Sequence, residues 1–296
     1  MNKIIKTFLM SLFLFSSIAQ DAYAWWDVSH MVVAQIAKDQ IDLKTLTKAE
    51  NLLEYFKDGF PASSTFITSS CFPDDITSIG LSGFKVWHGV LTPYSIDGYL
   101  SEKEIGCIEA LIGDNNLHSA IRQSIKTLKN PNASRWEKCF LLRFLLHTVA
   151  DIHQPLHCVQ LYSPQFPKGD LAGHKFLISG MPYRNLHLLW DSAFGIGSEK
   201  MPRPLSDDDV TRIEHLARFI TEKWPSANLP EKDNMNILDW SEESYKLAVE
   251  VAYSNIQLGE MPSEQYLEAG KEVAIRQIAL AGYRLAILLE EIFKDD

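Results

Sequence analysis

A short segment of the chain combines histidines and a carboxylate at a spacing that suits metal binding. Residues 147–157 contain three histidines and one aspartate, directly after the apolar run 140–146. His147 and Asp151 stand four residues apart. On a helix this spacing puts an imidazole and a carboxylate on one face, with Cβ atoms about 5–6 Å apart. Two such groups can bind one cation.

A second pair with the same spacing lies downstream, at His187 and Asp191. One such pair is a weak signal, because many helices carry histidine and aspartate at this spacing by chance. His157 adds a further nitrogen ligand just beyond the break at Pro155. Together these residues predict a site for several metal ions, and zinc suits it because zinc accepts imidazole and carboxylate ligands where thiolates are absent.

Helices must hold these residues, since apolar side chains recur at helical spacing along most of the chain. The helix over 135–153 is the most apolar and is expected at the centre of the fold, with Pro155 ending it. The pattern predicts further helices over 28–40, 45–57, 102–112, 116–129, 186–193, 207–224, 239–256 and 263–294.

Two segments break the helical pattern. Residues 59–75 are rich in proline, serine and threonine and are expected to form a loop. Residues 162–183 carry prolines and glycines, and 175–178 is expected to form one strand of a small hairpin. We find no repeat or linker, so residues 25–296 are predicted to form a single compact, mainly α domain with one irregular hairpin excursion.

The first 24 residues have the marks of a cleaved signal peptide. Lys3 and Lys6 precede an apolar stretch, and Ala-Tyr-Ala at 22–24 fits the small-x-small cleavage pattern. Cleavage after Ala24 leaves Trp25 as the new N-terminus and predicts a secreted or periplasmic protein. An uncleaved membrane anchor is the alternative, although the apolar stretch is short for a bilayer span.

The net charge bears on the partners that the protein can attract. Removing Lys3, Lys6 and Asp21 changes the formal charge from −10 to −11, with 26 basic and 37 acidic residues left. An acidic protein does not attract nucleic acid through its overall field. If it handles phosphates, bound cations must supply the positive charge.

Export allows disulfides, and the four cysteines permit three complete pairings. A Cys139–Cys158 bridge is disfavoured, because a helix starting near Cys139 would separate the two residues by about 20 Å, whereas bridged Cα atoms lie within about 7 Å. Cys71–Cys107 is the candidate bridge. A cysteine-rich zinc site is disfavoured, because no two cysteines lie close together in the sequence.

Further candidate ligands lie outside the opening segment. His30 falls in the first predicted helix, Asp74 and Asp75 fall in the predicted loop, and His88 follows Trp87. A surface or core role explains each of these residues better when it is taken singly. Their joint occurrence with the two pairs is what favours a metal site.

These residues give the chain a family resemblance. It resembles the secreted zinc-dependent single-strand nucleases and 3′-nucleotidases of fungi, plants and bacteria, whose superfamily includes bacterial zinc phospholipase C. The resemblance covers the whole chain after residue 24. Its marks are Trp25 with His30 five residues on, Phe72-Pro-Asp74, Trp87-His88, residues 147–157, Asn185-Leu-His187-Leu-Leu-Trp-Asp191 and Gly282-Tyr-Arg-Leu-Ala286.

The resemblance implies a centre of three zinc ions in which Asp151 bridges two metals and orients the attacking water, with Asp74 as a second catalytic carboxylate. Its ligand sets would be Asp74, His88, His147 and Asp151; then His157, His187 and Asp191; then His30, Asp151 and the free amine and carbonyl of Trp25. The amine has an ordinary pKa of about 7.7–8.0, so it can lose its proton to a metal. Before cleavage the same nitrogen is an amide, so the precursor is expected to lack one zinc.

The implied activity is metal-assisted hydrolysis of single-stranded DNA, RNA and 3′-nucleotides that leaves 5′-phosphates, with no stable protein partner. A zinc phospholipase C acting on phospholipid is the first alternative, but its final ligand pair usually ends in glutamate, whereas this chain has Asp191. A non-catalytic zinc-binding protein is the second, and the complete ligand set argues against it.

The chain departs from the family where substrate would be recognised. Leu91 replaces an aspartate that holds the base, Thr77 replaces a basic residue that many members carry, and Ala172-Gly173-His174 replaces Gly-Gly-Asn. His174 is therefore a substrate contact, an extra proton donor or an exposed loop histidine.

Several other side chains have two interpretations each. Trp87, Phe84 and Tyr162 could stack on bases or pack in the protein, and Trp190 is expected in the core. His153 points away from the face of His147 and Asp151 and is expected to pack behind the site. His118 and His215 are expected to be solvated.

Overall fold

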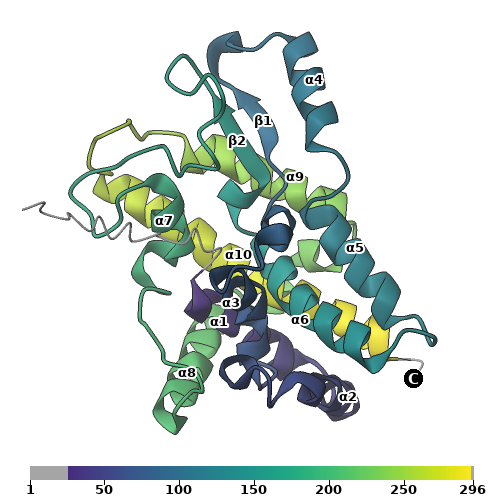
Figure 1. The fold of residues 1–296 in the computed structure, drawn as a ribbon. Coiled ribbons are helices and arrows are strands. Elements are labelled where there is room, and N and C mark those ends of the chain that lie inside the picture. The colour runs from purple at the N-terminus through teal and green to yellow at the C-terminus, as the bar shows by residue number, and fades with distance from the viewer. Residues whose placement is uncertain (1–25, 295–296) are drawn as a thin grey trace, which may run out of the picture.

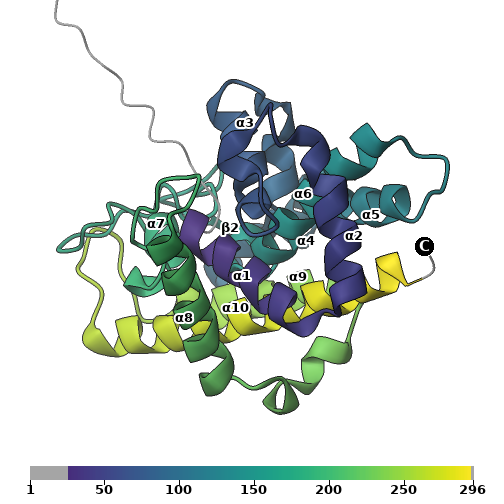
Figure 2. The ribbon, with the colours of Figure 1, turned by 90° about the horizontal axis from the view of Figure 1, so that it is seen from below.

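The long C-terminal helix α10 (Glu264–Phe293) runs across the molecule, and the other central helices pack against it. The first helix, α1 (Asp27–Gln40), crosses it, and α6 (Arg135–Asp151) packs against both. α8 (Asp207–Lys223) lies beside α1 in Figure 2 and contacts it. The computed structural model describes residues 26–294, so the predicted signal peptide lies outside the described residues.

Each helix predicted from the sequence is confirmed, with small shifts at the ends. The remaining α-helices are α2 (Leu43–Leu53), α3 (Phe72–Ser78), α4 (Glu102–Ile112), α5 (Leu117–Leu128), α7 (Leu186–Asp191), α8 (Asp207–Lys223) and α9 (Ile237–Leu247), the last continued by a π-helical turn at Ala248–Ala252. Together they make the described chain a mainly α domain, as Figure 1 shows.

Local signals in the sequence explain where the central helices begin and how closely they pack. Ser134 and Glu137 form a capping box at the start of α6, in which each side chain bonds a free backbone N–H. Gly282 lies where α10 crosses α1, and a Cβ there would stand 2.5 Å from Cγ2 of Ile36. Only glycine permits this close approach of the two helices.

The segment 59–75 is not the loop that its composition predicts. Two 3-10 turns, Pro61–Ser63 and Thr68–Cys71, lead directly into α3, which carries Asp74 and Asp75 in its first turn. The hydroxyls of Ser69 and Ser70 are buried and bonded locally, Ser69 Oγ to the Ser63 carbonyl at 3.0 Å and Ser70 Oγ to the Ile67 carbonyl at 2.7 Å. Serine and threonine therefore support tight turns here rather than an exposed loop.

The small sheet also differs from the expected hairpin. β1 (Thr92–Ser95) and β2 (Val159–Tyr162) pair in parallel, with Thr92 opposite Val159. The predicted strand at 175–178 contributes a single antiparallel bridge, between Leu177 and Asn185.

The predicted Cys71–Cys107 bridge is not formed. Cys71 is buried beside α1, where its thiol contacts the Asp27 carbonyl, and Cys107 is exposed on α4. Cys139 and Cys158, which were not expected to pair, are free as well. None of the helices in residues 26–294 combines the length and apolar character needed to cross a membrane.

Candidate metal centre

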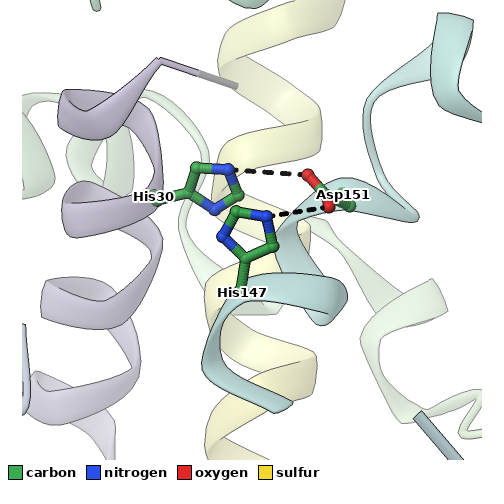
Figure 3. A group of neighbouring side chains, drawn as sticks. All are labelled: His30, His147 and Asp151. Atoms are coloured by element: carbon green, nitrogen blue, oxygen red, sulfur yellow. Dashed lines mark ion pairs between the residues drawn. The ribbon is translucent and has the colours of Figure 1, made fainter. Parts of the chain in front are cut away.

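The end of α6 and the first helix bring together His30, His147 and Asp151 (Figure 3). Nε2 of His30 lies 3.5 Å from one carboxylate oxygen of Asp151, and Nε2 of His147 lies 3.1 Å from the other. The two imidazoles stack, with ring centroids 3.9 Å apart. All three side chains are fully buried, so their polar atoms face one another and not water.

A second group shares His147 with the first and adds Asp74 and His88. Nδ1 of His88 lies 3.6 Å from Asp74 Oδ1 and 3.2 Å from Asp151 Oδ2. The His88 side chain is 15% exposed, whereas Asp74 and His147 are buried. His88 therefore lies where solvent or substrate can reach the centre.

The third group consists of His157, His187 and Asp191. Nε2 of His187 lies 3.0 Å from Asp191 Oδ2, and Nε2 of His157 lies 3.6 Å from Asp191 Oδ1. Nδ1 of His157 also lies 3.5 Å from Asp151, which connects this group to the first. The turn after Pro155 thus places His157 between the two His-x-x-x-Asp pairs.

Backbone carbonyls fix the orientation of three of the imidazoles. Nδ1 of His147 bonds the Ser70 carbonyl at 2.7 Å, Nδ1 of His157 bonds the His88 carbonyl at 2.7 Å, and Nδ1 of His187 bonds the Ala172 carbonyl at 2.6 Å. Such bonds leave Nε2 as the free lone pair, which is how proteins prepare histidine for a metal.

Many polar atoms of the three groups are buried and have no hydrogen-bond partner among the described residues. They include both nitrogens of His30, both carboxylate oxygens of Asp151, Oδ2 of Asp74 and Asp191, and Nε2 of His88 and His157. Buried groups of this kind are costly unless a partner satisfies them. Nitrogen and carboxylate atoms that converge without partners fit divalent cations, so the residues present suit a metal centre.

Burial and mutual charge set the protonation of these groups. Burial alone would raise the pKa of Asp151, but the imidazoles of His147 and His157 outweigh it and hold this pKa well below its ordinary value. Asp191 behaves in the same way, with a pKa lowered to about 2 against the effect of burial. Both carboxylates therefore stay ionised, as cation ligands must.

The structure brings together all the predicted ligands that it describes: His30, Asp74, His88, His147, Asp151, His157, His187 and Asp191. Trp25 lies outside the described residues. Its neighbour Trp26 donates a hydrogen bond from its backbone N–H to the Asp191 carbonyl at 3.1 Å. The described chain therefore begins directly beside the third group.

The candidate substrate residues lie close to the centre. His174 is half-buried, and its ring stacks on that of His187 with centroids 3.7 Å apart. Trp87 is half-buried too; its indole N–H donates to Asn115 Oδ1 at 2.7 Å, and its ring packs edge-on against Phe144. Leu91 and Thr77 are partly buried. The rings of His174 and Trp87 therefore already pack against other aromatic side chains.

The other predicted side chains have mixed outcomes. Trp190 is fully buried and His215 is exposed, as expected. His153 is buried behind the site, where Nε2 lies 2.9 Å from the Arg284 guanidinium. The expectation for His118 is wrong: it is half-buried and bonds Ser241, and burial lowers its pKa to about 4. Phe84 packs with Trp87, and Tyr162 is buried.

Two residues that support the site, Gln154 and Arg203, were not predicted from the sequence. Gln154 is fully buried and donates from Nε2 to Asp191 Oδ1 at 2.6 Å. Its position inside the 147–157 segment was the available signal. Arg203 bonds both carboxylate oxygens of Asp75 at 2.7 and 2.8 Å and Asp27 at 2.9 Å, which ties α3 to α1. Nothing local in its proline-rich surroundings marks this role.

Comparisons with known proteins agree with this geometry. Endonuclease 5 of Arabidopsis thaliana is 24% identical to the chain, over 98% of the chain and 97% of its own length. Nuclease S1 of Aspergillus oryzae is 25% identical, over 93% of the chain and 94% of its own length. The family model described as S1/P1 Nuclease matches residues 25–294. The chain therefore belongs to the S1/P1 nuclease family, whose members hydrolyse phosphodiester bonds with the help of metal ions.

Proposed function

We propose that this protein is an exported nuclease that uses three zinc ions to cleave single-stranded DNA and RNA, leaving 5′-phosphates, and that it also removes the phosphate of 3′-nucleotides. The observation that carries the proposal is the position of Asp151. Its carboxylate lies within 3.5 Å of His30, His88, His147 and His157, and neither oxygen has a hydrogen-bond partner among the described residues. One carboxylate that faces so many imidazoles suits a bridge between metals.

The chain's own residues have distinct tasks in this proposal. Asp74, His88, His147 and Asp151 would hold one zinc, His157, His187 and Asp191 a second, and His30, Asp151 and Trp25 a third. Zinc at these positions supplies a Lewis acid that polarises a phosphoryl oxygen and lowers the pKa of water. Asp151 stays ionised and orients the attacking water, and the carbonyl-bonded imidazoles keep the ligand geometry fixed.

The free amine of Trp25 makes export part of activation. The bond from Trp26 N–H to the Asp191 carbonyl holds the start of the described chain beside the ligands, which supports a ligand role for the residue before it. A protein with one extra residue before Trp25 has an amide at this nitrogen. We expect it to bind about one zinc fewer and to be nearly inactive.

One experiment tests the substrate class. Purified protein beginning at Trp25 is incubated with single-stranded DNA, 3′-AMP and phosphatidylcholine vesicles, with and without chelator, and zinc is measured by plasma mass spectrometry. We expect hydrolysis of DNA and 3′-AMP that stops with chelator and returns with zinc. Hydrolysis of the lipid alone would instead identify a phospholipase. A fully zinc-loaded protein that hydrolyses none of the three would be a binding protein.

A further inference from the structure

A cavity of about 860 Å³ opens next to the metal centre. One wall is formed by the start of α1 and by α3, through Trp26, Asp27 and Asp75. The opposite wall is formed by residues 182–185 and 197–203. This volume is in the range of sites that bind small organic ligands.

Residues that line the cavity are neighbours of the candidate metal ligands. Asp75 follows Asp74 on α3, and Asn185 caps α7, the helix that carries His187. His174 lines the cavity and stacks on His187 at 3.7 Å. The cavity therefore lies beside the third group of ligands.

The charges in the cavity leave two cations available. Its carboxylates are already paired, Asp27 and Asp75 with Arg203 and Glu199 with Arg212. Arg184 and Lys200 line the cavity, are exposed, and form no ion pair with another described residue.

We propose that this cavity is a second binding subsite for single-stranded nucleic acid, which holds the part of the strand next to the phosphate being cleaved. The proposal rests on the nuclease function proposed above. Arg184 and Lys200 bind a neighbouring phosphate of the strand, since free cations at the rim of a groove follow a nucleic-acid backbone. Trp26, half-buried and packed edge-on against Tyr183 at 5.5 Å, provides an aromatic surface for the adjoining base.

The chemistry of the cavity favours a polynucleotide over a lipid. An acyl chain needs a continuous apolar lining, whereas these walls contain Asp27, Asp75, Asn185, Ser198 and Glu199 beside the cations. A lining that combines two free cations with an aromatic side chain suits a chain that carries both phosphates and bases.

The test is a double variant, Arg184→Ala with Lys200→Ala. Its kcat/KM is measured on a single-stranded decanucleotide and on bis-p-nitrophenyl phosphate, which has one phosphate and therefore no neighbouring phosphate for Arg184 and Lys200 to bind. Arg122→Ala with Lys126→Ala, two exposed residues on α5, is the matched control for charge. We expect the cavity variant to lose about tenfold on the decanucleotide, mostly through KM, and to match wild type on the small substrate.

Salt dependence provides a second measurement. Each lost contact with a single-strand phosphate lowers the slope of log kcat/KM against log salt by about 0.7, so we expect a flatter dependence for the cavity variant alone. Equal losses on both substrates, or wild-type rates and salt slope on the decanucleotide, overturn the subsite and leave the nuclease function intact. A wild-type protein that cleaves the small substrate and no oligonucleotide overturns both proposals.

Discussion

The two His-x-x-x-Asp pairs of the metal centre have nearly the same geometry and very different supports. His147 and Asp151 end α6, which has 17 residues, whereas His187 and Asp191 lie on α7, which has 6. The distance from Nε2 to Oδ2 is 3.1 Å in the first pair and 3.0 Å in the second. The spacing on one helical turn therefore sets the geometry within a pair, whatever the length of the helix.

The longer helix is held mainly by burial. Leu142, Leu145, Leu146 and Val149 of α6 lie fully buried in the main hydrophobic cluster. Buried Arg143 donates to the Leu53 carbonyl and to Ser69 Oγ, which holds the neighbouring turns against the helix. Many apolar contacts together stabilise α6, so no single polar contact decides the position of His147 and Asp151.

The shorter helix buries Leu186, Leu189 and Trp190 in a second hydrophobic cluster, and specific polar contacts hold it as well. Asn185 caps its start, Gln154 bonds Asp191, and the indole N–H of Trp190 donates to Tyr266 Oη at 3.0 Å. His187 is oriented by the Ala172 carbonyl, in the irregular segment before the helix. A ligand pair on a short helix therefore relies more on individual hydrogen bonds than a pair on a long one, and each of these bonds can be tested.

We expect the largest difference in activity and metal content between variants of the two carboxylates, Asp151 and Asp191. Asp151→Asn changes the group that faces all three clusters, whereas Asp191→Asn changes one cluster. We expect Asp151→Asn to lower kcat at least ~1000-fold and to remove more than one zinc, and Asp191→Asn to remove about one. Zinc content and phosphodiesterase rates of the purified variants measure this. Equal zinc loss in both variants would contradict the bridging role of Asp151.

A smaller effect is expected from the residue behind Asp191. Gln154→Ala removes the donor to Asp191 Oδ1, and partners of metal ligands are typically worth about 10–100-fold in metal affinity. We expect the weakest zinc to dissociate at correspondingly lower chelator concentrations in a competition titration. Gln35→Ala is the control, because this buried glutamine bonds Asp39, which is not a ligand. If both variants keep wild-type zinc affinity, α7 does not depend on Gln154.

This difference in support also explains what the sequence could predict. Apolar periodicity and histidine spacing are local properties, so α6, its ligands and the pairing on α7 follow directly from neighbouring residues. The contacts that hold α7 join distant residues, such as Trp190 with Tyr266, and leave no local pattern. The parallel strands likewise join Thr92 to Val159, while the expected hairpin was placed between neighbours. Composition misled us at 59–75, where the hydroxyls of Ser69 and Ser70 bond inside buried turns.

The polar contacts of α7 and α6 should also differ in how much they contribute to the free energy of unfolding. Tyr266→Phe leaves the buried N–H of Trp190 without its acceptor, which costs about 1–3 kcal/mol of unfolding free energy. Thr148→Val on α6 is the comparison variant. It also removes one side-chain hydrogen bond, the one that Thr148 Oγ1 donates to the Phe144 carbonyl within the helix. We expect this second change to cost less, since it orphans no buried donor. Urea unfolding of the zinc-loaded proteins measures both, and a larger loss for Thr148→Val would reverse the comparison.

The smallest effect concerns the backbone before α7. Gly173 has φ of +87°, and an added Cβ would lie 3.1 Å from Leu156 Cδ1 and 3.2 Å from the backbone nitrogen of His187. We expect Gly173→Ala to lower the unfolding free energy by about 1–2 kcal/mol, because a side chain is strained in this left-handed conformation.

The same substitution elsewhere should act in the opposite direction. Gly106 lies within α4, where an added Cβ meets nothing within 4 Å. Gly106→Ala should therefore stabilise the protein by about 0.5–1 kcal/mol, since alanine suits a helix interior better than glycine. Because an added side chain at Gly173 would press on the start of α7, its variant should also release the metal ion proposed at His157, His187 and Asp191 before the others. If the two variants change stability in the same direction and keep the same zinc affinity, the irregular segment does not hold the second pair in place.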